Sequence, residues 1–116
     1  MVSYMDNNIK EYIDQDEALS RIGGNMSLYK RLLGRFTDGN AFADLVSAVE
    51  SGNFEDAAHQ AHTLKGVSAN LSLVKLRSLS VDIELLLKEN KDCSSCLEEL
   101  KQAYAVTLEK IAELVS

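Results

Sequence analysis

A histidine and a lysine stand one helical turn apart in the stretch from Ala61 to Leu71, and a glycine follows the lysine directly. At about 100° per residue, His62, Lys65 and Gly66 share one side of a helix. The opposite side, which we expect to be buried, carries Ala57, Ala61, Leu64, Ser68 and Leu71. A neutral imidazole is a nucleophile that can accept a phosphoryl group and release it again. An ammonium group close to it could stabilise the phosphoryl oxygens. These residue types would therefore allow phosphoryl transfer on His62.

The neighbours of His62 on the helix surface are small. Ala58 lies one turn before it and Ala69 two turns after it, while Gly66 lacks even a Cβ atom. Space matters here because an acceptor imidazole must meet a phosphorylated partner in line. A glycine inside a helix costs roughly 1 kcal/mol relative to alanine, so Gly66 calls for a reason. Clearance for a phosphoryl group supplies one.

Other interpretations stay open from the residues alone. An exposed histidine is most often an ordinary surface residue, here of a structural helical interaction module. His59, three residues before His62, could supply a second metal ligand, but further ligands would be needed and Glu55 is the nearest acidic candidate. No serine or cysteine stands in a pattern with a base and an orienting acid, which argues against a hydrolase.

Length and charge limit the class of protein. A chain of 116 residues has the size of one domain and can bury a core without a metal or a disulfide. Its net charge of -6 would be repelled by nucleic-acid phosphates. No apolar run reaches the roughly 20 residues of a membrane span, and the first residues lack the pattern of a signal peptide. We expect a soluble, cytoplasmic domain that contacts neither nucleic acid nor membrane.

Cys93 and Cys96 form a single CxxC pair. Without a second pair or a nearby histidine, the pair supplies half of a zinc site, and no βαβ pattern supports a redox motif. We expect two reduced cysteines at the start of a helix. A zinc or thiol module is the alternative, and it would carry stoichiometric zinc.

Apolar residues recur at helical spacing in four long stretches separated by polar turns. These begin near Met26, Phe54, Leu73 and Ser94. Between Phe36 and Phe42 the apolar stripe turns by about 240°, so we expect a break near residues 38–40. In the third stretch, charged residues that include Asp82 and Glu84 should lie off the apolar stripe.

A shorter apolar pattern at residues 9–22 predicts an additional N-terminal helix, which Gly23, Gly24 and the capping residue Asn25 should end. We therefore predict an all-α fold, an antiparallel up-and-down four-helix bundle with a short additional N-terminal helix. Residues 1–8 should form a flexible leader and residues 9–116 the bundle domain.

The run from His62 to Leu71 resembles the signature of histidine-containing phosphotransfer (HPt) domains, in which a histidine is followed by x-L-K-G and then by small residues. The N-terminal pattern and the later helical stripes also resemble this family, over about residues 9–115. One position departs from it: many members have a glycine after the Asn-Leu pair, where this chain has Ser72. The departure puts the geometry of that turn in doubt more than the chemistry.

The resemblance implies a phosphocarrier of a two-component phosphorelay rather than an enzyme. His62 would be the phosphoacceptor, Lys65 would stabilise the phosphoryl group, and Gly66 would give it steric clearance. The group would come from the phosphoaspartate of one response-regulator receiver domain and pass to the aspartate of another. The docking surface would include three flanking residues, Ala58, His59 and Ala69.

The resemblance also bears on cofactors and partners. It implies no cofactor in this chain, and Mg²⁺ would belong to the acidic pocket of the receiver domain. The expected partners are response-regulator receiver domains and a sensor histidine kinase, with the chain itself a monomer. The family includes phosphoacceptor domains of chemotaxis-type kinases, which a kinase phosphorylates directly using ATP. That alternative stays open, as does a place within a larger hybrid kinase.

Overall fold

The structure of the chain, a computed structural model, describes residues 10–116, and the regular secondary structure in this range is entirely helical. After helical residues 10–12, the helices are α2 (Gln15–Arg21), α3 (Met26–Asp38), α4 (Ala41–Glu50), α5 (Phe54–Leu71), α6 (Val74–Lys88) and α7 (Ser94–Val115). The prediction of an all-α fold is confirmed. The predicted leader, residues 1–8, lies outside the described residues.

The described part of the chain has more helices than the predicted four plus one, because the predicted first long helix is divided into α3 and α4. The backbone of Gly39 is extended, with a ψ of 175°, as expected for a break in this region. On either side of the break, Phe36 and Phe42 both contact Tyr104 of α7. The ring of Phe42 stacks on Tyr104 with centroids 3.9 Å apart, and Phe36 meets it edge-on at 6.1 Å. The break therefore restores the phase that a straight helix would have lost.

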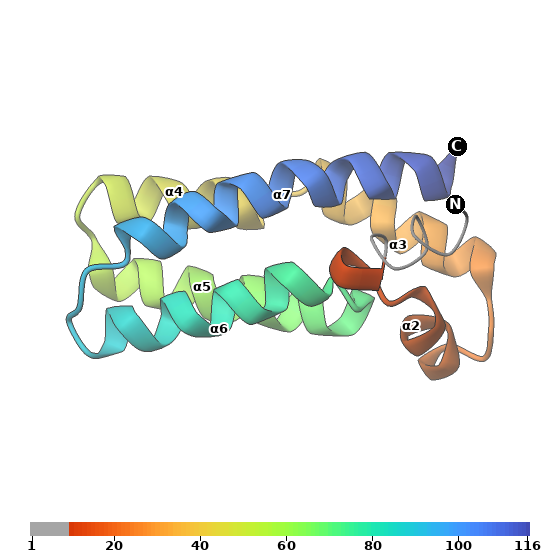
Figure 1. The fold of residues 1–116 in the computed structure, drawn as a ribbon, viewed down its shortest axis with the longest axis horizontal. Helices are drawn as coiled ribbons and strands as arrows, with labels where there is room; N and C mark the ends of the chain where they lie inside the picture. Colours follow the sequence, from red (N-terminus) through yellow and green to blue (C-terminus); the bar gives the residue numbers. More distant parts are fainter. Residues whose placement is uncertain (1–9) are drawn as a thin grey trace.

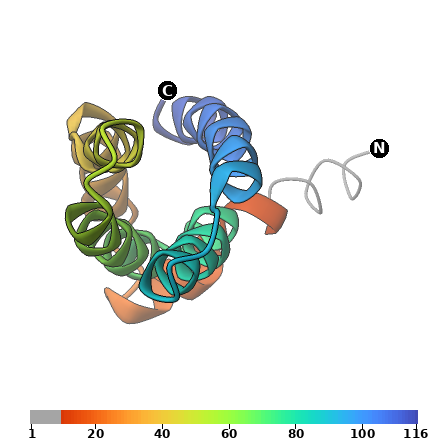
Figure 2. The ribbon, with the colours of Figure 1, turned by 90° about the vertical axis from the view of Figure 1, so that its left-hand side faces the viewer.

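The helices α4, α5, α6 and α7 lie roughly parallel to one axis, and each runs in the opposite direction to the one before it (Figure 1). Seen from one end, α4, α5, α6 and α7 follow one another around an arc, so that α5 lies between α4 and α6 (Figure 2). Asparagine caps begin α3 and α5. The side chain of Asn25 accepts a hydrogen bond from the amide of Leu28 in α3, and that of Asn53 accepts one from the amide of Asp56 in α5. These caps satisfy amides that a helix start leaves without a partner.

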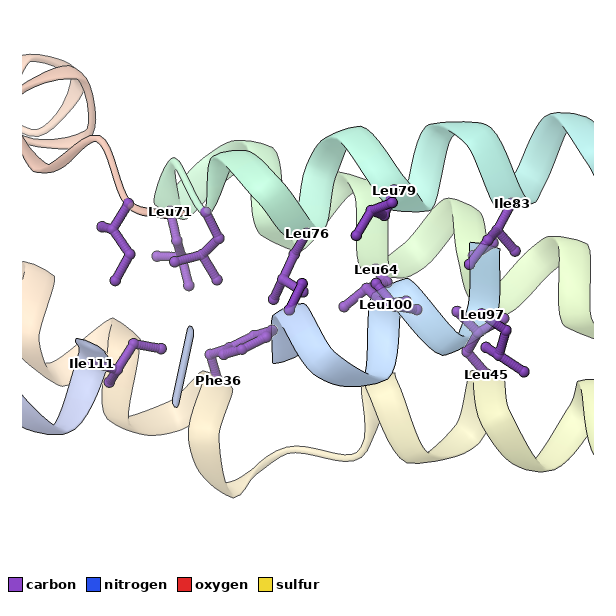
Figure 3. Close-up of a cluster of buried hydrophobic side chains, with 14 of the residues drawn as sticks. Phe36, Leu45, Leu64, Leu71, Leu76, Leu79, Ile83, Leu97, Leu100 and Ile111 are labelled. Atoms are coloured by element: carbon purple, nitrogen blue, oxygen red, sulfur yellow. The ribbon is translucent and has the colours of Figure 1, made fainter. Parts of the chain in front are cut away.

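Leucines and other apolar side chains from all the long helices meet in one core (Figure 3). The buried residues of α5 are Ala57, Ala61, Leu64, Ser68 and Leu71, the face that the periodicity predicted. Small residues on this face let α5 approach its neighbours closely. Burial of this face turns the opposite side of α5, with His62, to solvent.

The end of α5 resolves the departure at Ser72. Its φ of 55° is left-handed, a conformation in which glycine is usual and a Cβ atom is unfavourable. The hydroxyl of this buried serine donates to Glu17 Oε1 at 2.7 Å and accepts from Arg21 Nη2 at 2.6 Å. Two hydrogen bonds to α2 thus accompany the unfavourable backbone conformation.

We expect Ser72→Ala to lower the free energy of unfolding by about 1–3 kcal/mol, because alanine keeps the left-handed strain and loses both hydrogen bonds. Ser72→Gly should cost less, since glycine relieves the strain. Urea denaturation followed by circular dichroism measures both, with Ser78→Ala on the exposed side of α6 as a control. Equal stability of Ser72→Ala and the wild type would contradict this account.

Candidate functional site

The side chain of His62 stands on the exposed side of α5 with 63% of its surface accessible. It is nevertheless held in place from one side. Its Nδ1 lies 3.0 Å from Oε2 of Glu84, which comes from the neighbouring helix α6. The ring is therefore both accessible and oriented, the two properties that a nucleophile on a protein surface needs.

Glu84 is the centre of the site. Its side chain is only 7% exposed, and it accepts from three groups: Lys65 Nζ contacts Oε1 at 2.8 Å, while His62 Nδ1 and Lys88 Nζ each lie 3.0 Å from Oε2. Burial alone would raise the pKa of Glu84, but the hydrogen bonds from Lys65, Lys88 and His62 outweigh it and lower the pKa to about 2. The carboxylate is therefore ionised at neutral pH.

An ionised carboxylate decides which ring nitrogen of His62 carries the hydrogen. Because it can only accept, the group facing it must donate, so Nδ1 carries the hydrogen. In the neutral ring, Nε2 then keeps its lone pair. Nε2 is accordingly the nucleophilic atom of this imidazole.

The sequence-based placement of Glu84 on the solvent side of α6 was wrong. A second buried row of α6, Leu76, Ser80 and Glu84 at four-residue intervals, lies beside the leucine stripe. The small Ser80 in this row and Lys88 one turn after Glu84 were the available signals. Neither identifies His62 as the partner, since that contact joins residues 22 positions apart.

The other predicted site residues lie around the ring. Lys65 belongs to the site through Glu84: its ammonium forms an ion pair with the carboxylate that also contacts His62. A Cβ atom added at Gly66 would meet nothing within 4 Å, so core packing does not require a glycine there. Ala58 and Ala69 are half-buried and His59 is exposed, all on α5. Sequence reasoning missed both Glu84 and Lys88.

A groove of about 570 Å³ opens on another side of α5, between this helix and α2, α3 and α4. Leu32, Phe36 and Val67 form part of its apolar wall, and the exposed Arg35 adds a positive charge. Asn70 belongs to the groove and lies two turns after His62, with Gly66 midway between them. A continuous strip of α5 surface thus connects the imidazole with the groove.

The cysteine pair lies away from this site. Cys93 caps the start of α7 and Cys96 follows in its first turn, both as free thiols, as expected. Burial and the Asp92 carboxylate raise the pKa of Cys93, and burial foremost raises the pKa of Cys96 to about 11. Both are therefore protonated, poorly nucleophilic thiols at neutral pH.

Two searches over residues 10–116 bear on other functions. No group of three or more histidine, cysteine, aspartate or glutamate side chains in this range could hold a metal ion. None of the helices in the described range has the length and apolar character needed to cross a membrane.

Comparison with known proteins gives a family. The chain matches the family model described as "Hpt domain" over residues 39–112, a stretch that contains α4, α5, α6 and most of α7. Searches among curated proteins and among solved structures found no match. The match covers more than half of the chain and includes His62 with its carboxylate partner Glu84, and the chain belongs to the Hpt domain family.

Proposed function

We propose that this protein carries phosphoryl groups on His62 between receiver domains of a two-component phosphorelay. One observation supports this most directly: the exposed imidazole of His62 donates a hydrogen bond through Nδ1 to the buried, ionised carboxylate of Glu84. That arrangement leaves a lone pair on Nε2 of an imidazole whose side chain is mostly exposed. Membership of the Hpt family supports histidine phosphotransfer as the chemistry. The protein then acts as a carrier, and works in the cytoplasm as a monomer.

In the proposed step, the Nε2 lone pair attacks the phosphorus of an aspartyl phosphate on the receiver domain. The N–P bond forms as the P–O bond to the aspartate breaks, and the aspartate carboxylate leaves with the electron pair. No proton has to move, because Nδ1 keeps its hydrogen. The imidazole gains a positive charge, which the Glu84 carboxylate at 3.0 Å stabilises. Delivery to a second receiver is the reverse reaction.

Lys65 is the proposed cation for the phosphoryl oxygens. It lies one turn after His62, and its side chain is partly exposed while its ammonium contacts Glu84. Phosphoryl transfer depends chiefly on positioning and on stabilisation of charge. Lys65 therefore starts beside the ring and turns toward the phosphoryl group as it arrives. Any Mg²⁺ is held by the acidic pocket of the receiver domain.

The receiver domain is proposed to cover the exposed side of α5, with Ala58, His59 and Ala69 in the contact. The apolar groove lined by Leu32 and Phe36 continues this surface, so that a receiver seated over His62 can also insert apolar side chains there. Arg35 in the groove complements an acidic partner. An apolar centre with a polar margin is the usual anatomy of such interfaces.

The fold fits this role if two consecutive helices are treated as one member of a four-helix bundle. We interpret α3 and α4 together as one side of an antiparallel four-helix bundle whose other members are α5, α6 and α7, with α2 as the additional N-terminal helix. In this arrangement α5 and α6 lie side by side and hold His62 and Glu84 against each other. The bundle is thus the scaffold that orients the imidazole.

Phosphotransfer from a panel of purified, phosphorylated receiver domains tests the proposal. At least one receiver should transfer an acid-labile, alkali-stable label to the wild-type protein within the time of a relay reaction. The alternative, a structural helical module, predicts no label from any receiver. Labelling only by a kinase with ATP would favour the chemotaxis-type phosphoacceptor instead.

Gly66→Ala separates the carrier from a structural module. A Cβ atom at Gly66 meets no protein atom within 4 Å, so alanine should raise the free energy of unfolding by a few tenths to about 1 kcal/mol. If His62 is the acceptor, the same methyl group obstructs the approach of the phosphorylated partner and transfer becomes slower. Thermal denaturation and transfer kinetics on one preparation measure both effects. A more stable variant with unchanged transfer would favour the structural module.

A further inference from the structure

Lys88 is a second lysine that contacts the Glu84 carboxylate, and it comes from a different helix than Lys65. It lies one turn after Glu84 on α6, and its Nζ is 3.0 Å from Oε2, the oxygen that also accepts from His62. Lys65 contacts the other oxygen, Oε1. The side chain of Lys88 is 62% exposed, whereas that of Glu84 is 7% exposed. Two cations from different helices therefore share one buried carboxylate without sharing an oxygen.

This sharing matters because Lys65 has two tasks in the proposed function. It neutralises Glu84 in the resting protein, and it meets the phosphoryl oxygens during transfer. A buried carboxylate that loses its cation is strongly destabilised. If Lys65 were the sole cation on Glu84, its move toward the phosphoryl group would leave the carboxylate with His62 alone. Lys88 removes this conflict, since it stays on Oε2.

The charges lead to the same role. Glu84 with Lys65 and Lys88 carries one net positive charge beside a neutral ring. A phosphoryl group adds a charge of about −2 at neutral pH. Because the ring gains one positive charge at the same time, the phosphorylated site is about neutral with Lys88 and carries about one negative charge without it. Because this negative charge already approaches the site in the transition state, Lys88 stabilises the transition state more than the resting site, which is the condition for an effect on rate.

We propose that Lys88 is a positioning residue for phosphoryl transfer on His62: it holds the Glu84 carboxylate on Nδ1 and frees Lys65 for the phosphoryl group. This inference rests on the proposed function. Lys88 itself acts through Glu84 and does not touch the reacting atoms. Because the side chain of Lys88 is exposed while its partner Glu84 is buried, the charge at residue 88 can be changed without a substitution in the core.

The test compares Lys88→Gln and Lys88→Arg with the control Lys91→Gln, which removes a lysine that contacts Glu89 instead. Two donors are used, a phosphorylated receiver domain and phosphoramidate, a small donor that has no docking surface. Lys88→Gln should lower kcat about threefold to tenfold with both donors and leave KM for the receiver unchanged. Lys88→Arg should retain most of the rate, because it keeps the cation.

A second measurement does not depend on transfer. Carbon-13 NMR of the Glu84 carboxyl should find its pKa raised in Lys88→Gln and unchanged in Lys91→Gln, since one of its three donors is lost. A change confined to KM for the receiver would assign Lys88 to docking and overturn the inference, as would equal kcat values for Lys88→Gln and Lys91→Gln. If no donor labels the wild-type protein at His62, the proposed function itself fails.

Discussion

His62→Gln should accept no phosphoryl group from any receiver domain that labels the wild-type protein. Glutamine is similar in length and can still hydrogen-bond to Glu84, but its amide nitrogen has no lone pair available for attack on phosphorus. The loss should therefore be complete within the sensitivity of the assay. Autoradiography after incubation with the phosphorylated receiver measures it.

The fold should survive this substitution, because the His62 side chain is mostly exposed and does not belong to the buried face of α5. Circular dichroism and denaturation check that the variant is intact. His59→Gln is the matched control: it removes the neighbouring histidine of α5, which is also exposed, and should leave labelling unchanged. Label that persists in His62→Gln and disappears in His59→Gln would move the acceptor to His59.

Glu84→Gln should slow transfer at least about tenfold while His62 remains present. A neutral amide can accept a hydrogen from Nδ1 or donate one to it, so it no longer keeps the lone pair on Nε2. It also cannot stabilise the positive charge that the ring gains on phosphorylation. Single-turnover transfer measures the rate, and nitrogen-15 NMR of the imidazole reports which ring nitrogen carries the hydrogen.

The same substitution should change the dependence of stability on pH. Because the pKa of Glu84 in the folded protein, about 2, lies below its ordinary value of 4.5, ionisation of this group stabilises the folded state. This contribution is complete above about pH 5 and is lost as the pH falls toward 2. Between these limits, the free energy of unfolding of the wild type should fall by about 2 kcal/mol more than that of Glu84→Gln.

Glu89→Gln provides the control for both measurements, since Glu89 is an exposed residue of the same region whose carboxylate forms an ion pair with Lys91 rather than with the His62 site. It should behave as the wild type in transfer and in denaturation across this range of pH. Parallel pH profiles of Glu84→Gln and the wild type would mean that Glu84 is not the buried, ionised group described above. Unchanged transfer in Glu84→Gln would remove it from the proposed mechanism.

The chemotaxis-type alternative makes the same demands on His62 and Glu84, because the ring must attack a phosphorus atom in either case. The two differ in the donor, which is an aspartyl phosphate in one and ATP bound to a kinase in the other. Comparing a receiver panel with a kinase and ATP therefore decides between them. The substitutions above keep their expected effects under both.

Local residue patterns were sufficient to predict the helices and the exposure of His62. Apolar spacing, asparagine caps and glycines act over a few residues, so the predicted start of α5 near Phe54 agrees with the structure. Even the break between α3 and α4 could be predicted from the phase between Phe36 and Phe42. Helical periodicity also placed His62 opposite the buried face. These properties depend on residues a few positions apart, so they can be predicted from the order of residue types along the chain.

The groups that surround the imidazole depend instead on how the helices pack against one another. Glu84 and Lys88 lie on α6, and their distance from His62 depends on the rotation and tilt of that helix against α5, which no local pattern specifies. Residue by residue, Glu84 looked like a solvent-facing charge, whereas packing buries it between two lysines and the histidine. The groove between α2, α3, α4 and α5 likewise joins segments far apart in the chain. The residue that accepts the phosphoryl group could be proposed from the sequence, but the carboxylate that orients it follows from the packing of α6 on α5.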